Sequence, residues 1–362
     1  MSNRRWQEDG IYVLSVGAQT PVGRSALRSA AAVRCGISAY REHPFMIDRH
    51  GEPMVVAMAD WLPETMLHSD RMVSMAMDAL LCAFQGALPT NGNKTIPVMF
   101  AMSSSRFPRE ELRIAVAQKI IIELQKQGFV VRSQILAEEN AVGVLAVQHA
   151  VSWLEQGVSD VVAVAGFDSH LGVEHLEQLD YNGMLHSINN SWGFTPGEAA
   201  GAIVLTTGKR LNQTGAIPVA RLAAVAIGTE SKLLSTKTVC IGEGLTQAFR
   251  GSLSESDKVS YSYCDLNGET YRADEFGFAV CRTRESFYDA GRFTAAAECW
   301  GDVGAASVPL QVALAASAWL RGYAHGATIL CWSSSASSPL RGALRLSNSW
   351  QTLERQFHVR HD

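Results

Sequence analysis

Charged residues are scarce in this chain of 362 residues: Asp, Glu, Lys and Arg together make up only 18%. No block of Lys or Arg stands out, and 31 basic against 35 acidic residues leave a formal net charge of −4. Proteins that bind nucleic acid usually carry a basic patch that attracts phosphates, so this composition argues against such a partner. The low charge also indicates that much of the surface is buried, as it is in an oligomer.

The cysteines lack any pattern typical of a disulfide framework or a zinc site. The chain has seven of them, an odd number, and no two form a CxxC pair. We therefore expect reduced thiols in the cytoplasm. The seven are Cys35, Cys82, Cys240, Cys264, Cys281, Cys299 and Cys331.

Motifs for nucleotides, metals and cofactors are also missing. The segment GAQTPVG (residues 17–23) turns a strand into a helix, but its glycines match neither GxGxxG nor a P-loop. His43, Asp48 and His50 stand at irregular spacings, which is typical of surface polar residues and not of a metal site. We expect no cofactor and no metal.

Long apolar runs and a secretion signal are absent as well. The first ten residues, MSNRRWQEDG, lack an apolar core, and no stretch approaches about 18 uninterrupted apolar residues. We expect a soluble, cytoplasmic protein that does not contact a membrane. The 47% of hydrophobic residues are enough for a sizeable core.

The most informative stretch covers residues 137–170. Residues 141–155 are apolar on nearly every face, which is typical of a helix buried in a large core; Gly157 ends it, and residues 161–165 form a short apolar strand. A loop that leads into a buried helix is a usual place for an enzyme nucleophile, because the helix N-terminus stabilises a thiolate or an oxyanion. Asn140 occupies that place, and asparagine cannot act as a thiolate does.

Strands and helices alternate along the chain, which favours a layered α/β fold with central sheets covered by helices. The polar segment 208–215 divides the chain into halves, residues 1–207 and 208–362, and the second half repeats the layout of the first. Two stretches, 42–64 and 168–190, are expected to be loop-rich. Expected strands are 11–16, 95–102, 129–136, 161–166, 217–227, 258–266, 328–332 and 343–346; expected helices are 24–34, 71–85, 110–125, 141–155, 242–253, 273–284 and 304–323.

Four stretches, in order, resemble the thiolase superfamily and its β-ketoacyl synthase branch. They are IYVLSVGAQTPVG, GVLAVQHAVSWLEQGVSDVVAVAG, GFTPGEAAGAIVL and GDVGAAS. The resemblance covers roughly residues 10–346. It implies a five-layered α/β/α/β/α sandwich of two similar halves, usually homodimeric. The expected dimer seam is the strand that begins at Val161 and ends at Gly166.

The family's catalytic residues are all replaced in this chain. The family's cysteine lies seventeen residues before the helix-ending glycine, which corresponds to Asn140. Its first histidine, in an HGT loop, corresponds to Asn267 of LNGET, and its second to Asp302 of GDVGAAS. The family's lysine falls on Ala297, and the glycine-rich gate is replaced by SSSASSP (residues 333–339).

Loss of the cysteine and both histidines removes catalytic interactions, each of which typically raises the reaction rate by ~10²-fold or more. We therefore predict that the catalytic site is vacated and that the chain is a pseudoenzyme. Asn140, Asn267 and Asp302 are expected to converge on one buried polar cluster and to satisfy one another's hydrogen bonds.

Other residues offer little replacement chemistry. Cys264 and Cys299 each lie three residues before a vacated position, but we expect both to be buried, inert thiols. Glu138 and Glu139 adjoin Asn140 and have no visible partner for acid–base work. An acyltransferase or decarboxylase with a rebuilt site nevertheless stays an alternative.

The chain resembles thiolase-like proteins of bacterial type VI secretion loci. The resemblance rests on its size, its first segment RRW…VLSVGAQTPVG, the stretch GIS…EHPFMIDRHGEPM (residues 36–54) and the loss of the catalytic triad. This resemblance implies a co-adaptor or chaperone that binds an adaptor or effector protein of the secretion system. A further alternative is an inactive partner subunit of an active β-ketoacyl synthase, comparable with the family's chain-length subunits.

Overall fold

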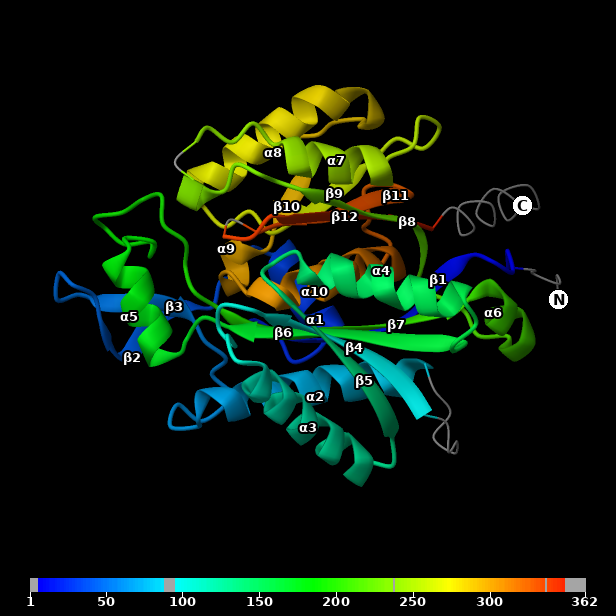
Figure 1. The fold of residues 1–362 in the computed structure, drawn as a ribbon, viewed down its shortest axis with the longest axis horizontal. Helices are drawn as coiled ribbons and strands as arrows, with labels where there is room; N and C mark the ends of the chain where they lie inside the picture. The colour runs from blue at the N-terminus through cyan, green and yellow to red at the C-terminus, as the bar shows by residue number, and fades with distance from the viewer. Residues whose placement is uncertain (1–5, 88–94, 237, 336, 349–362) are drawn as a thin grey trace.

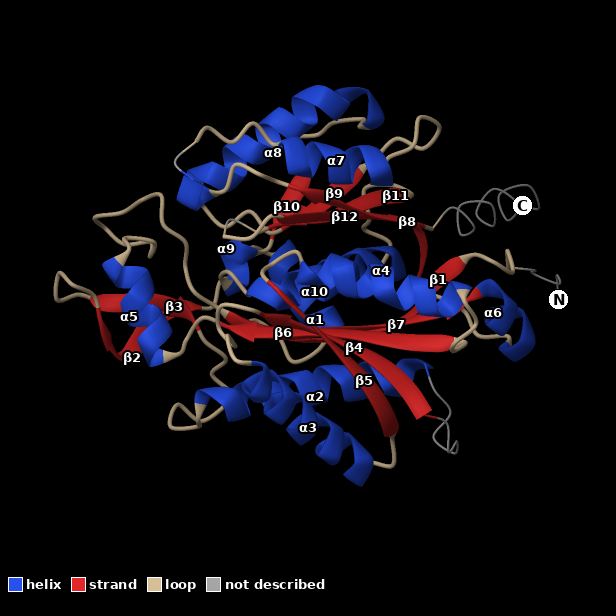
Figure 2. Cartoon of the chain, viewed as in Figure 1, coloured by secondary structure: helices blue, strands red, loops and turns tan. Residues whose placement is uncertain are grey.

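The structure, a computed structural model, describes residues 6–87, 95–236, 238–335 and 337–348. Helices and sheets alternate in five layers, with a pair of helices on each outer face and further helices between the two sheets (Figures 1 and 2). This is the thiolase-like α/β/α/β/α sandwich that the sequence predicts.

Both halves build the same kind of sheet. The first has the order β5 (Val130–Glu138), β4 (Thr95–Ser103), β6 (Val161–Ser169), β7 (Glu198–Thr207) and β1 (Ile11–Gln19). The second has the order β10 (Phe293–Ala295), β9 (Tyr261–Cys264), β11 (Thr328–Ser334), β12 (Leu340–Ser347) and β8 (Ala220–Thr229). When the five strands of each sheet are numbered in chain order, leaving aside the separate β2–β3 hairpin, both sheets have the order 3-2-4-5-1. The sheets join where β1 pairs antiparallel with β8, from Ile11↔Leu222 to Val13↔Ala220.

The middle layer contains α1 (Ala26–Arg34), α4 (Val142–Glu155) and α10 (Ser307–Leu320), which pack against apolar strands of both sheets in one large core. α10 is buried from Ser307 to Trp319, because apolar and small residues surround it on every side. Close packing depends on glycine: a Cβ on Gly143 of α4 would lie 2.6 Å from Val308 Cβ of α10. The centre of the molecule is therefore tightly filled.

The outer layers are amphipathic helices. α2 (His68–Ala87) and α3 (Glu110–Lys126) cover the first sheet, and α7 (Glu243–Ser252) and α8 (Thr270–Thr283) cover the second (Figure 1). On α2, Met72, Met75 and Leu80 are buried, as a core-filling methionine stripe requires. Further short helices of the described chain include α6 (Gly208–Thr214) after β7 and α9 (Ala297–Trp300) before α10.

The two stretches expected to be loops are more ordered than the sequence indicates. Residues 42–64 include the hairpin of β2 (Tyr40–Ile47) and β3 (Pro53–Ala57), and residues 168–190 include α5 (Val173–Tyr181). Together these elements project from one side of the sandwich (Figure 1). These short elements are stabilised by a small hydrophobic core of their own. Its members include Met54, Val56, Leu171, Leu176, Leu179 and Phe194.

The expected dimer seam is wrong. The strand from Val161 to Gly166 lies inside the sheet, because β6 pairs parallel with β4 on one side and antiparallel with β7 on the other. Neither edge is open to a second chain. Among the described strands of this half, β5 pairs only with β4, so β5 is the edge strand.

Among the helices of the described ranges, none combines the length and hydropathy needed to cross a bilayer. The boundary between the halves at residue 207 stays a prediction; in the structure α6 follows β7 at that point and leads to β8.

Candidate functional site

Asn140 lies where β5 leads into α4, as the sequence predicts, and is 5% exposed. The first turn of α4 has no side-chain cap of its own. Instead the backbone N–H of Ala141 donates to Ser335 Oγ at 3.0 Å, from the serine-rich loop of the other half. One of the backbone donors that the start of a helix offers to an anion is therefore already used.

Asn140 and Asn267 converge on the carboxylate of Asp302, as the sequence predicts for these three side chains. Asn140 Nδ2 donates to Asp302 Oδ1 at 3.1 Å, and Asn267 Nδ2 donates to Asp302 Oδ2 at 2.7 Å. The backbone N–H of Gly304 also donates to Oδ1, at 2.8 Å. Segments far apart in the sequence thus meet at Asp302, which is 4% exposed.

Two basic side chains also face Asp302. His170 Nε2 lies 3.5 Å from Oδ1, and Arg272 Nη2 lies 3.5 Å from Oδ2. Burial alone would raise the pKa of Asp302, but His170 and Arg272 outweigh it and hold this pKa well below its usual range. Asp302 is therefore an anion that accepts hydrogen bonds.

Arg272 links this carboxylate to the second sheet. It pairs with Asp265 Oδ2 at 3.0 Å and Glu269 Oε2 at 2.9 Å, and it donates to the Ser334 carbonyl at 2.6 Å. Burial raises the pKa of Asp265 to about 6, although Arg272 opposes the shift. Burying an arginine and its carboxylates costs desolvation free energy, and the resulting ion pairs fix the positions of these side chains.

A second ion cluster lies at the end of β6. Arg106 Nε donates to Asp168 Oδ1 at 2.6 Å, and Arg106 Nη1 lies 3.4 Å from Glu139 Oε2. Asp168 Oδ2 accepts from the Ala305 N–H at 2.9 Å, beside the Asp302 loop. Arg106 lowers the pKa of Asp168 against the opposing effect of burial. Asp168 therefore positions the loop that carries Asp302.

Glu139 is held by hydrogen bonds and by an ion pair. Its carboxylate accepts from Ser104 Oγ at 2.7 Å and from the Ser105 N–H at 2.8 Å, in addition to its contact with Arg106. Glu138 belongs to β5 and is half-buried. The adjacent carboxylates thus serve the scaffold.

The serine-rich segment at the end of β11 is built into the core, and its first two serines, which the sequence assigned to a loop, belong to the strand. Ser333, Ser334 and Ser335 are all 0% exposed. Ser333 Oγ and the Ser334 N–H both donate to Asp265, and Ser334 Oγ donates to Glu275. These bonds hold the described part of the loop in place; Ala336 lies outside the described residues.

Little space is left beside Asp302. The pocket that Asp302 lines with Cys264 and Trp300 has a volume of about 10 Å³, roughly the space of one water molecule. Burial raises the pKa of both Cys264 and Cys299, so each is held as a thiol and not as the nucleophilic thiolate. The arrangement around Asp302 therefore supports packing and hydrogen bonding more readily than chemistry on a substrate.

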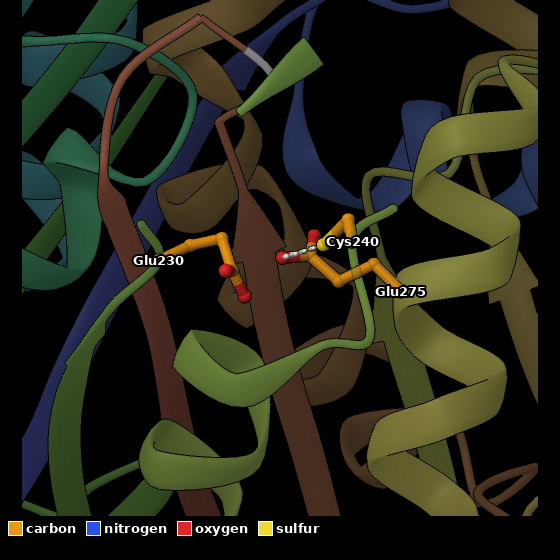
Figure 3. Close-up of side chains that lie close together, drawn as sticks. All are labelled: Glu230, Cys240 and Glu275. Carbon is orange, nitrogen blue, oxygen red and sulfur yellow. Dashed lines mark hydrogen bonds between the residues drawn. The ribbon is translucent and has the colours of Figure 1, made fainter. Parts of the chain in front are cut away.

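One group of side chains has the composition of a metal site. Glu230, Cys240 and Glu275 are buried, their potential ligand atoms lie within 4.8 Å of one another, and Figure 3 shows Cys240 Sγ directed at Glu275. The carboxylates are already neutralised or satisfied, since Glu275 pairs with Arg341 and Glu230 accepts from the Gly244 N–H at 3.0 Å. Burial raises the pKa of Cys240. We assign a structural role to this group.

Sequence reasoning missed four members of the site: Arg106, Asp168, His170 and Arg272. The segment DSH (residues 168–170) contains the last two residues of β6 and the residue after it, and polar residues at the end of a buried strand were a usable signal for Asp168 and His170. The two arginines gave no local signal, because their partners are up to 62 residues away. The sequence therefore predicted the contact among Asn140, Asn267 and Asp302 and missed the charged residues around it.

Neither a protein-family model nor a curated protein sequence matches the chain. Solved structures do. The chain is similar to the ishigamide ketosynthase/chain length factor, with a TM-score of 0.74 and 15% identity over 95% of this chain and 100% of that one. A ketosynthase in complex with its chain length factor, from Xenorhabdus doucetiae, gives 0.71 and 14% over 93% and 98%. The ketosynthase from module 6 of the bacillaene synthase of Bacillus subtilis 168 gives 0.72 and 14% over 93% and 72%. At these identities the likeness shows the fold.

Proposed function

We propose that this protein is a non-catalytic thiolase-fold protein of the cytoplasm, and that it acts by binding another protein. The observation that carries this proposal is the Asn140–Asp302–Asn267 cluster, in which the three vacated positions bond to one another. Each of these three side chains makes a hydrogen bond within the cluster, and a buried network of this kind stabilises one arrangement of the core.

The charge of Asp302 supports the same conclusion. A decarboxylating condensation passes through an enolate, which needs hydrogen-bond donors aimed at its developing negative charge. Asp302 is an anion, and its pKa lies below its usual range. A second negative charge at this place would be repelled, so the residue that replaces the family's histidine opposes the family's reaction.

For the partner we propose an adaptor or effector of a type VI secretion system, with this protein as co-adaptor. The sequence resemblance in the opening strand and in residues 36–54 supports this partner. The test is co-purification: the affinity-tagged full-length chain is co-expressed with the adaptor and effector encoded beside it. Recovery of either protein in a fixed ratio supports the role, and recovery of neither overturns it.

A second candidate is an inactive subunit paired with an active ketosynthase. It is supported by the ketosynthase/chain length factor pairs among similar structures and by the edge strand β5, which is open to a partner strand. The molar mass measured by light scattering after size-exclusion chromatography distinguishes the co-adaptor role from the inactive-subunit role. The co-adaptor role fits a homodimer formed through β5, whereas the subunit role requires a stable 1:1 complex with a ketosynthase encoded nearby.

A further inference from the structure

The β2–β3 hairpin forms one wall of a groove on the part that projects from the sandwich. The opposite wall is the segment after α5, residues 183–190, and the volume is about 340 Å³. We call this the hairpin groove. Its walls include Glu42, Glu52, Pro53 and Val55 on the hairpin side and Leu185 and Ile188 on the other.

Local hydrogen bonds fix the hairpin wall. His43 Nδ1 accepts from the N–H groups of Phe45 and Met46 at 3.2 and 3.1 Å, which supports the irregular part of β2. Asp48 Oδ1 accepts from the N–H groups of His50 and Glu52 at 2.8 and 2.9 Å and closes the turn. The wall is thus formed before a ligand arrives, which reduces the ordering cost of binding.

The opposite wall is held in the same way. Asp180 Oδ2 accepts from the Arg49 N–H at 2.9 Å, so the hairpin turn is attached to the end of α5. Asn190 Nδ2 donates to the carbonyls of Gly183 and Leu185 at 2.8 and 2.9 Å. Both walls of the hairpin groove therefore have a defined shape.

Apolar side chains are unusually exposed on the elements that form the groove. Ile188, at the groove, is 93% exposed, and Trp192, four residues further, is 69% exposed. On β2, Phe45 and Ile47 are 69% and 63% exposed. Single exposed apolar residues are ordinary, but several large ones on one small projecting part are typical of a surface that contacts another protein.

The charge at the groove has one dominant sign. Its lining holds four carboxylates, Glu42, Asp48, Glu52 and Asp180, and one guanidinium, Arg49. Asp48 and Asp180 are used by the turn, whereas within the described residues the exposed carboxylates of Glu42 and Glu52 have no recorded cation or hydrogen-bond donor. Even with Arg49 counted, carboxylates outnumber cationic side chains in the lining of the groove, and Glu42 and Glu52 are exposed.

We propose that the hairpin groove is the docking site for an extended, basic segment of the partner protein; this inference rests on the proposed function. An extended segment fits because β3 pairs with β2 along one edge, while in the described residues the second edge makes one bridge, Ala57 to Gly197. Lysine or arginine side chains complement Glu42 and Glu52. A second copy of this chain fits poorly, since it has the same acidic groove and no basic block.

The direct test uses the purified full-length protein and two fluorescein-labelled peptides, Lys-Val repeated four times and Glu-Val repeated four times. Fluorescence anisotropy at low salt is expected to show binding of the lysine peptide only, weakened by added salt. The variant Glu42→Lys/Glu52→Lys is expected to bind at least tenfold more weakly. The matched control Glu111→Lys/Glu255→Lys makes the same change of charge at exposed sites elsewhere and is expected to bind as the wild type does. Urea midpoints verify that both variants fold.

No binding of the lysine peptide, equal binding of both peptides, or equal weakening in the control variant would overturn the groove proposal. Co-purification with the adaptor and effector encoded beside this protein distinguishes failure of the groove proposal from failure of the proposed function. If the groove variant retains the partner that the wild type recovers, the groove proposal fails alone. If the wild type recovers no partner, the proposed function fails, and the peptide result still decides whether the groove binds basic segments.

Discussion

The amide of Asn140, at the head of α4, donates to the carboxylate of Asp302 across 3.1 Å. These residues lie 162 positions apart, so the bond joins the two halves of the chain at the centre of the molecule.

The Asp302 carboxylate is expected to contribute measurably to stability. Asp302→Asn removes the charge that faces Arg272 and leaves the donors of Asn140, Asn267 and Gly304 with a weaker acceptor. We expect the free energy of unfolding to fall by about 2–3 kcal/mol, measured by urea denaturation. The control is Asp257→Asn, whose side chain is 63% exposed and pairs with Arg345. A change within about 0.5 kcal/mol is expected there, and equal effects in the two variants would contradict the account.

The loop of Asp302 requires glycine at position 304. Gly304 has φ of +47°, and a Cβ there would lie 2.0 Å from Asp168 Oδ2. Gly304→Ala is therefore expected to lower the free energy of unfolding by about 2–4 kcal/mol, from backbone strain and from displacement of the Arg106–Asp168 pair. Gly157→Ala is the matched control, because φ is +68° but no atom lies within 4 Å of the added Cβ. A loss of about 1 kcal/mol is expected there.

Stability should fall as the solution becomes acidic, in part through His175. Burial, followed by the charge of His170, lowers the pKa of His175 to about 3. The folded protein keeps this ring neutral while the unfolded chain takes up a proton below about pH 6.5, so stability is present above that pH and is lost as pH falls. From pH 7.5 to 5.0 this loss is about 2 kcal/mol.

Urea denaturation at the two pH values tests this assignment. His175→Gln is expected to reduce the difference between pH 7.5 and 5.0 by about 2 kcal/mol. His325→Gln, at an exposed position, is expected to leave the difference as in the wild type. An unchanged difference in His175→Gln would mean that the ring titrates in the folded state as it does in the unfolded chain.

Restoring the nucleophile alone should not restore its reactivity. In Asn140→Cys the new thiol faces the Asp302 anion, and a nearby negative charge raises a thiol pKa. Iodoacetamide alkylation, followed peptide by peptide with mass spectrometry, is expected to rise only above about pH 8.5. Exposed Cys35 in the same sample provides the reference rate. An inflection below pH 7 at position 140 would show that the site still stabilises a thiolate.

The parts of the fold that follow from local pattern could be predicted from the sequence. α4 and β6 were recognised because a helix apolar on every face and a Val-rich run need no distant information. β6 was nevertheless assigned to the dimer seam. Its nearly complete burial indicates a neighbour on each side, which the structure confirms with β4 and β7. Sequence pattern identified the strand and did not identify its neighbours.

The β2–β3 hairpin and the charged residues around Asp302 could not be predicted without the three-dimensional structure. β2 contains Pro44, is mostly exposed and has an irregular register, so no alternation of apolar residues marks it as a strand. Arg272 on α8 and Asp302 after α9 belong to the same half, and only the folded arrangement of these two segments brings them within 3.5 Å of each other. Asn140, Asn267 and Asp302 could be placed because spacing and motif order survive where the chemistry does not.

The most direct measurement of the central claim is decarboxylation of a malonyl thioester by the purified wild-type protein. Malonyl and acyl thioesters of coenzyme A and of acyl carrier protein are supplied, carbon dioxide release is measured, and the intact mass of the protein is determined. The account predicts release at the rate of the protein-free control and no mass increase. Release well above that control, or an acyl adduct on the chain, would contradict it.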